Sequence, residues 1–212
     1  MPYRGLLCDL DGTLADTEPQ HCTAWLEMLE EELNLHYDVA WFDQWIGTSD
    51  REVAKYLIAE HGLYLEVDEI RLAKQARFQA IVRERGKSFP GVPEALAQIS
   101  GRFPLAIVTN SGRDDAEVIV PALGLDKYTE VVVTASDVAN LKPAPDSYLL
   151  AAKHLKLAAK DCIAMEDSAP GGAAAKAAGC YIIGLNDRVT MADELAGDNK
   201  TALLRALALL SE

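Results

Sequence analysis

The sequence predicts a protein of the α/β class, in which a parallel sheet wrapped by helices is interrupted by an all-helical insert. Short apolar runs alternate with helical patterns from about residue 88 onward, which is typical of a parallel sheet covered by helices. Residues 17 to about 87 show helical periodicity and little strand signal. The apolar run at residues 4–8 resembles the later strands, so we expect a core of residues 1–15 and 88–212 and a helical segment of residues 16–87.

The first strand is followed by a helix that begins near residue 17. Thr17 and Gln20 have the spacing of a capping box, and Glu18 is suited to the first turn of a helix. One apolar face is predicted by residues that recur at intervals of four, three and four: Cys22, Leu26, Leu29 and Leu33.

Two more helices are predicted in the insert, over residues 50–60 and 68–85, ending at Gly62 and Gly86. In the core we expect strands over residues 105–108, 131–133, 163–165 and 181–183. The core helices are expected over residues 92–100, 114–123, 146–156, 170–178 and 199–210. Gly124 and Gly179 stand where a helix end needs a left-handed residue.

The composition narrows the class of function. The net charge of −13 argues against a protein that binds nucleic-acid backbones, which needs a basic face. No signal peptide or membrane-spanning run is expected. The four cysteines are far apart in sequence, which argues against disulfides and a zinc site and favours a reducing cytoplasm: Cys8, Cys22, Cys162 and Cys180.

Two carboxylates follow the first predicted strand directly. Asp9 and Asp11 lie in the sequence Asp9-Leu10-Asp11-Gly12-Thr13. Because like charges at a strand end raise each other's proton affinity, this arrangement is costly unless a cation offsets it. A metal ion and a reaction are the usual reasons for such a pair.

The other predicted strands also end in polar groups. They lead to Thr109-Asn110-Ser111-Gly112, to Lys142-Pro143 and to Glu166-Asp167-Ser168. Ligands of doubly wound sheets bind beyond the carboxyl ends of the strands. Carboxylates suit Mg²⁺, and hydroxyls with a lysine suit phosphate. Taken singly, each segment is also compatible with a plain turn, a helix cap or a solvated lysine.

Together these segments resemble the four motifs of the haloacid-dehalogenase-like hydrolase superfamily. The resemblance covers essentially the whole chain and implies a Rossmann-like core with a helical cap. Within the superfamily the chain resembles the β-phosphoglucomutase-like branch, which also contains sugar-phosphate phosphatases. The residues that carry this second resemblance are Asp16-Thr17-Glu18, His21, Trp25 and Lys142-Pro143-Ala144-Pro145-Asp146.

The resemblance implies a role for each core motif. Asp9 is the expected nucleophile that forms an aspartyl-phosphate, and Asp11 is the expected general acid and base. Mg²⁺ is expected on Asp9, on the backbone carbonyl of Asp11 and on Asp167, with Glu166 adjacent. The phosphoryl group is expected to contact the remaining motif residues, which are Thr109, Asn110 through its backbone, Ser111 and Lys142.

Substrate specificity is expected to reside in the cap. His21 and Trp25 are four residues apart and share one side of a helix. With Glu18 and Arg51 they are candidate substrate contacts. Trp25 could equally be a core residue with His21 as its polar neighbour, and Arg51 could form a surface salt bridge.

The favoured function is a Mg²⁺-dependent phosphatase of a small phosphorylated metabolite, and a sugar phosphate is the expected substrate. The alternative is a hexose-phosphate mutase, which needs a second phosphate site in the cap. The mutase uses a lysine on the third cap helix, whereas Ala76 falls at that place in this chain, with Lys74 and Arg77 nearby. A further alternative is a non-catalytic binding protein. We expect a monomer with no nucleic-acid or membrane partner.

Overall fold

The computed structural model describes residues 2–212, which form two compact units. The α/β unit comprises residues 2–16 and 87–212, and the helical unit comprises residues 17–86. These boundaries lie one residue from the ones expected. Among the described residues, no helix combines the length and the apolar character needed to cross a bilayer.

The α/β unit is built on a six-stranded sheet in the order β3-β2-β1-β4-β5-β6, with every neighbouring pair parallel. The predicted fold class is therefore confirmed. The strands are β1 (Gly5–Cys8), β2 (Leu105–Val108), β3 (Val131–Val133), β4 (Cys162–Glu166), β5 (Tyr181–Gly184) and β6 (Glu194–Leu195). The two-residue β6 carries no apolar run, which is why the sequence pattern did not predict it.

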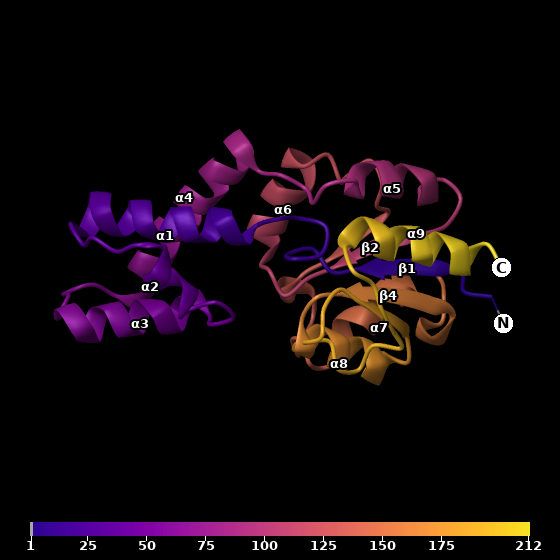
Figure 1. Cartoon of the computed structure of the whole chain (residues 1–212). Coiled ribbons are helices and arrows are strands. Elements are labelled where there is room, and N and C mark those ends of the chain that lie inside the picture. The colour runs from indigo at the N-terminus through magenta and orange to yellow at the C-terminus, as the bar shows by residue number, and fades with distance from the viewer. Residues whose placement is uncertain (1) are drawn as a thin grey trace. The chain divides into compact units, whose positions relative to one another are not determined.

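Helices cover both faces of this sheet (Figure 1). In that view α5 and α9 lie above the strands, and α7 and α8 lie below them. The helices of the unit are α5 (Val92–Ile99), α6 (Arg113–Ala122), α7 (Asp146–His154), α8 (Ala169–Ala178) and α9 (Asn199–Leu210), with 3₁₀ turns η1 (Ala135–Asp137) and η2 (Ala159–Asp161). Each predicted core helix is confirmed to within two residues.

The central strands are buried on both sides because helices cover the two faces. Every residue of β1, β2 and β4 is buried. A parallel strand of this kind reads as a continuous apolar run rather than an alternating one. Gly124 and Gly179 have the predicted positive φ, of 62° and 91°. All four cysteines are free thiols, as predicted.

The helical unit contains α1 (Glu18–Leu33), α2 (Val39–Asp43), α3 (Asp50–His61) and α4 (Val67–Arg85). The short α2 was not predicted. The most deeply buried apolar residues of α1 are Ala24, Trp25, Met28 and Leu29. Of the four residues predicted to form its apolar face, Leu29 is buried, and Cys22, Leu26 and Leu33 pack against the same core half-buried.

The capping box predicted at Thr17 is wrong. Thr17 precedes α1, but its side chain makes no capping hydrogen bond to the helix. The physical reason is its backbone conformation, with φ −95° and ψ −15°. A capping side chain reaches the N–H groups of the first turn from an extended residue, and Thr17 is already in the helical region.

Candidate active site

Asp9 lies directly after β1 and is held by a buried lysine. The Lys142 ammonium donates to Asp9 Oδ1 at 2.6 Å, to the Val108 carbonyl at 2.8 Å and to Glu166 Oε1 at 2.6 Å. Asp9 and Lys142 are each 7 % exposed. Because an ammonium has three donors, these contacts saturate it and link the carboxyl ends of β1, β2 and β4.

Glu166 ends β4, is fully buried and accepts four hydrogen bonds. Its Oε1 accepts from Lys142 at 2.6 Å and from the Tyr148 hydroxyl at 2.7 Å. Its Oε2 accepts from the Ser168 hydroxyl at 2.9 Å and the Ser168 N–H at 3.3 Å. A carboxylate offers about four acceptor positions, so the protein itself occupies those of Glu166. This carboxylate therefore anchors Lys142.

Two glycines give the carboxylates the room they occupy. A Cβ on Gly171 in α8 would overlap the Glu166 carboxylate. A Cβ on Gly12 would lie 2.7 Å from Asp167 Oδ2, and Gly12 has φ +79°. Gly12 is thus required both by its left-handed backbone and by the close approach of Asp167.

Asp11 lies two residues beyond Asp9 in a different environment. Its Oδ2 accepts from the Ser111 hydroxyl at 2.6 Å and from the Thr109 hydroxyl at 3.3 Å, both from the segment after β2. The Thr109 hydroxyl also accepts from the Ser111 N–H at 2.9 Å. The hydroxyls of Thr109 and Ser111, called the hydroxyl cluster below, therefore lie at Asp11 and orient its side chain.

Asn110 has a structural contact of its own. Its side-chain oxygen accepts from the Lys142 N–H at 3.0 Å, and its amide nitrogen donates to the Lys142 carbonyl at 3.3 Å. The side chain thus fixes the backbone that carries the buried ammonium. The backbone of Asn110 remains the predicted phosphate contact.

Asp167 follows Glu166 and is partly buried. Its Oδ1 accepts from the Thr13 hydroxyl at 3.3 Å, and its Oδ2 accepts from Arg188 Nη2 at 3.2 Å. Asn186 donates to the Asp167 carbonyl at 2.8 Å. Both Asn186 and Arg188 follow β5, so a fifth strand end contributes to this site.

Three carboxylates converge at this edge of the sheet. Oxygen atoms of Asp9, Glu166 and Asp167 lie within 4.8 Å of one another. Oxygen-rich, negatively charged sites of this kind suit Mg²⁺. The donor set fits the ion best through Asp9 and Asp167, because the protein already occupies the Glu166 oxygens. The Asp11 carboxylate belongs to the hydroxyl cluster instead, which leaves its backbone carbonyl as the predicted contribution to a metal site.

The electrostatics of the site reflect burial and crowding. Burial raises the pKa of Asp9 well above its ordinary value; the ammonium of Lys142 opposes this shift, and the neighbouring carboxylates add to it. The pKa of Asp167 is also raised, mainly by burial and then by the negative charge of Glu166. Burial lowers the pKa of Lys142, but the attraction of Asp9 and Glu166 outweighs it and leaves that pKa raised. A divalent cation would relieve the repulsion among these carboxylates.

The helical unit contains a pocket of about 120 Å³. Three of the predicted substrate contacts line it: Glu18, His21 and Trp25. Trp25 is also 1 % exposed and belongs to the apolar core of the unit, so one side chain fits both of the interpretations left open above. Arg51 is absent from the lining residues and pairs at the surface with Asp68, at 2.8 Å.

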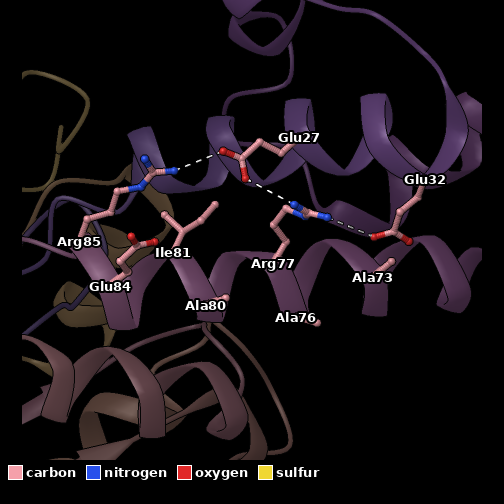
Figure 2. Close-up of a pocket in the computed structure, with 9 residues that line it drawn as sticks. All are labelled: Glu27, Glu32, Ala73, Ala76, Arg77, Ala80, Ile81, Glu84 and Arg85. Carbon is pink, nitrogen blue, oxygen red and sulfur yellow. Dashed lines mark hydrogen bonds and ion pairs between the residues drawn. The ribbon is translucent and has the colours of Figure 1, made fainter.

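The buried cation of the helical unit is Lys74. It is 1 % exposed, while Ala76, which the sequence comparison placed at the mutase lysine, lines a groove between α1 and α4 (Figure 2). The charged groups in that groove pair with one another, as Arg77 does with Glu27 and Glu32. The sequence comparison placed no lysine at the mutase position, but the structure buries Lys74 two residues before Ala76 on the same helix.

Comparison with known proteins agrees with this geometry. The family model described as haloacid dehalogenase-like hydrolase matches residues 3–179. The chain belongs to this family. The resemblance stated from the four motifs is thereby confirmed. Those motifs meet at the carboxyl ends of the parallel strands, where the site described above lies.

The curated relatives of this hydrolase include several phosphatases. The fructose-1-phosphate phosphatase YqaB of Escherichia coli (strain K12) is 33 % identical over 84 % of this chain and 93 % of its own length. The validoxylamine A 7'-phosphate phosphatase of Streptomyces hygroscopicus subsp. limoneus is 32 % identical over 86 % of this chain and 85 % of its own. Among solved structures, CbbY from Rhodobacter sphaeroides in complex with phosphate has a TM-score of 0.81 at 27 % identity, covering 99 % of this chain and 100 % of its own.

Sequence reasoning missed several residues of this hydrolase site. Asn186 and Arg188 follow β5, and the rule of strand ends could have found them. Asn199, which donates to the carbonyls of Gly12 and Thr13 at 3.2 and 2.7 Å, and Tyr148 both lie in helices. A single polar residue on a helix carries no sequence signal for such a role.

Proposed function

We propose that this chain is a Mg²⁺-dependent phosphatase that hydrolyses a small phosphorylated metabolite, a sugar or polyol phosphate, through an aspartyl-phosphate on Asp9. Its family and the phosphatases among its relatives make it a phosphoric monoester hydrolase. The substrate class is supported by relatives that are named a fructose-1-phosphate phosphatase, a phosphorylated carbohydrates phosphatase and a hexitol phosphatase.

The observation that carries the proposal is the difference between the two carboxylates of one loop. Asp9 contacts Lys142 and belongs to the acidic cluster, whereas Asp11 contacts the hydroxyls of Ser111 and Thr109. Carboxyl groups in different environments can take different chemical roles. The environment of Asp9 suits attack on phosphorus, and the environment of Asp11 suits proton transfer.

In the first step, an Asp9 carboxylate oxygen attacks phosphorus while the bond from phosphorus to the leaving oxygen breaks. Asp11, in its acid form, gives a proton to that oxygen. In the second step Asp11 takes a proton from water, whose oxygen attacks phosphorus and releases Asp9 and inorganic phosphate. Dehalogenation would need no such proton, so Asp11 favours phosphoryl transfer.

Other residues of the site would bind the phosphoryl group and the metal. The Lys142 ammonium, with Thr109, Ser111 and the backbone of Asn110, would stabilise the charge of the transferring group. Asp9, Asp167 and the Asp11 carbonyl would hold Mg²⁺, with Glu166 adjacent. When bound, the ion offsets the repulsion between the nucleophile and the phosphate.

The helical unit would act as the cap that determines specificity. Its pocket is lined by Glu18, His21 and Trp25, which we propose contact the part of the substrate that carries no phosphate. Arg51 stays a predicted contact. Mutase activity is less well supported, because the buried Lys74 is already paired with Asp50. The free thiols fit the predicted reducing cytoplasm.

The test is phosphate release from a panel of sugar and polyol phosphates, with and without Mg²⁺. Asp9→Asn should lower the rate by more than about 10³-fold, since it removes the nucleophile. Glu117→Gln changes an exposed carboxylate of the same unit and should keep the wild-type rate. Equal rates in Asp9→Asn and wild type would contradict the nucleophile, and isomerisation without phosphate release would favour the mutase.

A further inference from the structure

Lys74 of α4 is a buried ammonium whose donors are all used within the helical unit. Its Nζ lies 2.8 and 3.0 Å from the two carboxylate oxygens of Asp50 and 2.7 Å from His21 Nδ1. An ammonium has three donors, and these acceptors match them. Because the ammonium donates, His21 Nδ1 is the acceptor and its Nε2 carries the ring proton when the imidazole is neutral.

Aromatic side chains hold this arrangement in place. The Trp25 indole N–H donates to Asp50 Oδ1 at 3.1 Å. The His21 ring stacks on Phe78, with the ring centroids 4.0 Å apart and an interplanar angle of 5°. The Lys74 Nζ lies 5.6 Å from the Trp25 ring centroid and 5.3 Å from that of Phe78. Three helices thus fix the Asp50 carboxylate: α1, α3 and α4.

Asp50 stands between the buried ammonium and the pocket. Its side chain is 36 % exposed, against 1 % for that of Lys74. Asp50, His21 and Trp25 line the pocket, whereas Lys74 does not. The carboxylate therefore presents its negative charge to the pocket and lies in front of the Lys74 ammonium.

The pocket itself is acidic and small. Glu18 and Asp50 contribute carboxylates. Within the described part of the chain, no lysine or arginine lines the pocket. Its volume is about 120 Å³, which is enough to hold several water molecules or a small polar group. Carboxylates accept hydrogen bonds from hydroxyl groups and repel anions.

We propose that Asp50 is a specificity-determining residue that makes this pocket take an uncharged, hydroxyl-bearing part of the substrate and exclude a second phosphate. The inference rests on the proposed function for the identity of the reaction. It adds that the enzyme prefers monophosphates to bisphosphates, because Asp50 neutralises the cation that would bind a second phosphate. Replacing the carboxylate by an amide uncovers that cation.

The test compares two substrates that differ only in the second phosphate, fructose 1-phosphate and fructose 1,6-bisphosphate. The measured quantity is the ratio of kcat/KM for the bisphosphate to kcat/KM for the monophosphate. Asp50→Asn should raise this ratio by about tenfold or more. Asp50→Asn combined with Lys74→Met removes the uncovered cation and should return the ratio to the wild-type value.

Two further variants complete the design. Lys74→Met alone leaves the Asp50 carboxylate uncompensated and should lower the ratio below that of wild type, which tests the inference even if Asp50→Asn fails to fold. Glu52→Gln makes the same charge change on α3 at an exposed pair with Lys55, and it should leave the ratio unchanged. The inference would be overturned if folded Asp50→Asn has the wild-type ratio. It would also be overturned if the double variant Asp50→Asn/Lys74→Met keeps the raised ratio of Asp50→Asn.

Binding separates this inference from the proposed reaction. In the Asp9→Asn background, calorimetry measures the affinity for each fructose phosphate without turnover. If the wild type releases no phosphate but Asp50→Asn still shifts binding toward the bisphosphate, the proposed function fails and the specificity role of Asp50 stands. If phosphate is released and neither binding nor the ratio responds to Asp50→Asn, the specificity role fails alone.

Discussion

At the scale of single residues, the site depends on saturating its buried charges. The three donors of Lys142 go to Asp9, Val108 and Glu166, and Glu166 in turn accepts from Lys142, Tyr148 and Ser168. An uncompensated charge in such a place costs several kcal/mol. Each partner therefore holds the next in position, and the Asp9 carboxylate is oriented before any ligand arrives.

The role proposed for Asp11 leads to a prediction that depends on the leaving group. Asp11→Asn removes the proposed proton donor, so hydrolysis of a sugar phosphate should fall by about 10²–10⁴-fold. p-Nitrophenyl phosphate has a leaving group that needs no proton, so its first step should be largely preserved. Because the second step still needs a base, stopped-flow absorbance should show a burst of p-nitrophenol followed by slow turnover. Equal losses on both substrates without a burst would contradict the acid role.

At the scale of secondary-structure elements, the start of a helix is joined to the site. Ser168 precedes α8, and its hydroxyl accepts from the Gly171 N–H at 3.1 Å while donating to Glu166 Oε2 at 2.9 Å. Asp198 caps α9 in a similar way, because its carboxylate accepts from the Thr201 N–H at 2.9 Å and from the Thr201 hydroxyl at 2.7 Å, both within that helix. The two caps allow stability and activity to be separated.

We predict that Ser168→Ala and Asp198→Ala each lower the free energy of unfolding by about 1 kcal/mol, because each removes a helix cap. Only Ser168→Ala should also lower kcat, since it releases one hydrogen bond from the carboxylate that anchors Lys142. Urea unfolding and phosphate release measure the two effects. A matching loss of kcat in Asp198→Ala would show that activity follows stability rather than this bond.

At the scale of the whole molecule, the acidic cluster should couple metal binding to stability. Mg²⁺ that binds only the folded chain adds about 2.7 kcal/mol at a concentration of 100 Kd. For a chain of this length that corresponds to a rise in Tm of roughly 5–11 °C. Thermal unfolding with added Mg²⁺, and again after chelation, checks this prediction.

Asp167→Asn tests whether the stabilising ion binds at the acidic cluster, because it removes one of the three carboxylates there. Its Tm should respond far less to Mg²⁺, whereas Glu117→Gln should respond as the wild type does. A rise in Tm of the same size in Asp167→Asn would place the stabilising ion elsewhere. This readout is independent of catalytic activity.

Much of the fold could be predicted because its signals are local. The apolar run at 105–108 predicts a strand over those same residues, and Gly179 predicts a left-handed residue at its own position. The structure has both. The core motifs could be found because parallel strands bring their carboxyl ends to one edge of the sheet. The two-residue β6 and the short α2 lacked such a pattern.

The sequence by itself determined which polar residues gather at one edge of the sheet, because Asp9, Asp11, Lys142 and Asp167 follow strands whose carboxyl ends parallel topology brings together. Only the tertiary structure decided how charges are paired. Lys74 on a charge-rich helix reads as a surface residue, yet it is buried against Asp50 and His21, which are 24 and 53 residues away. Such pairing depends on which helix faces meet, and packing between distant segments determines that.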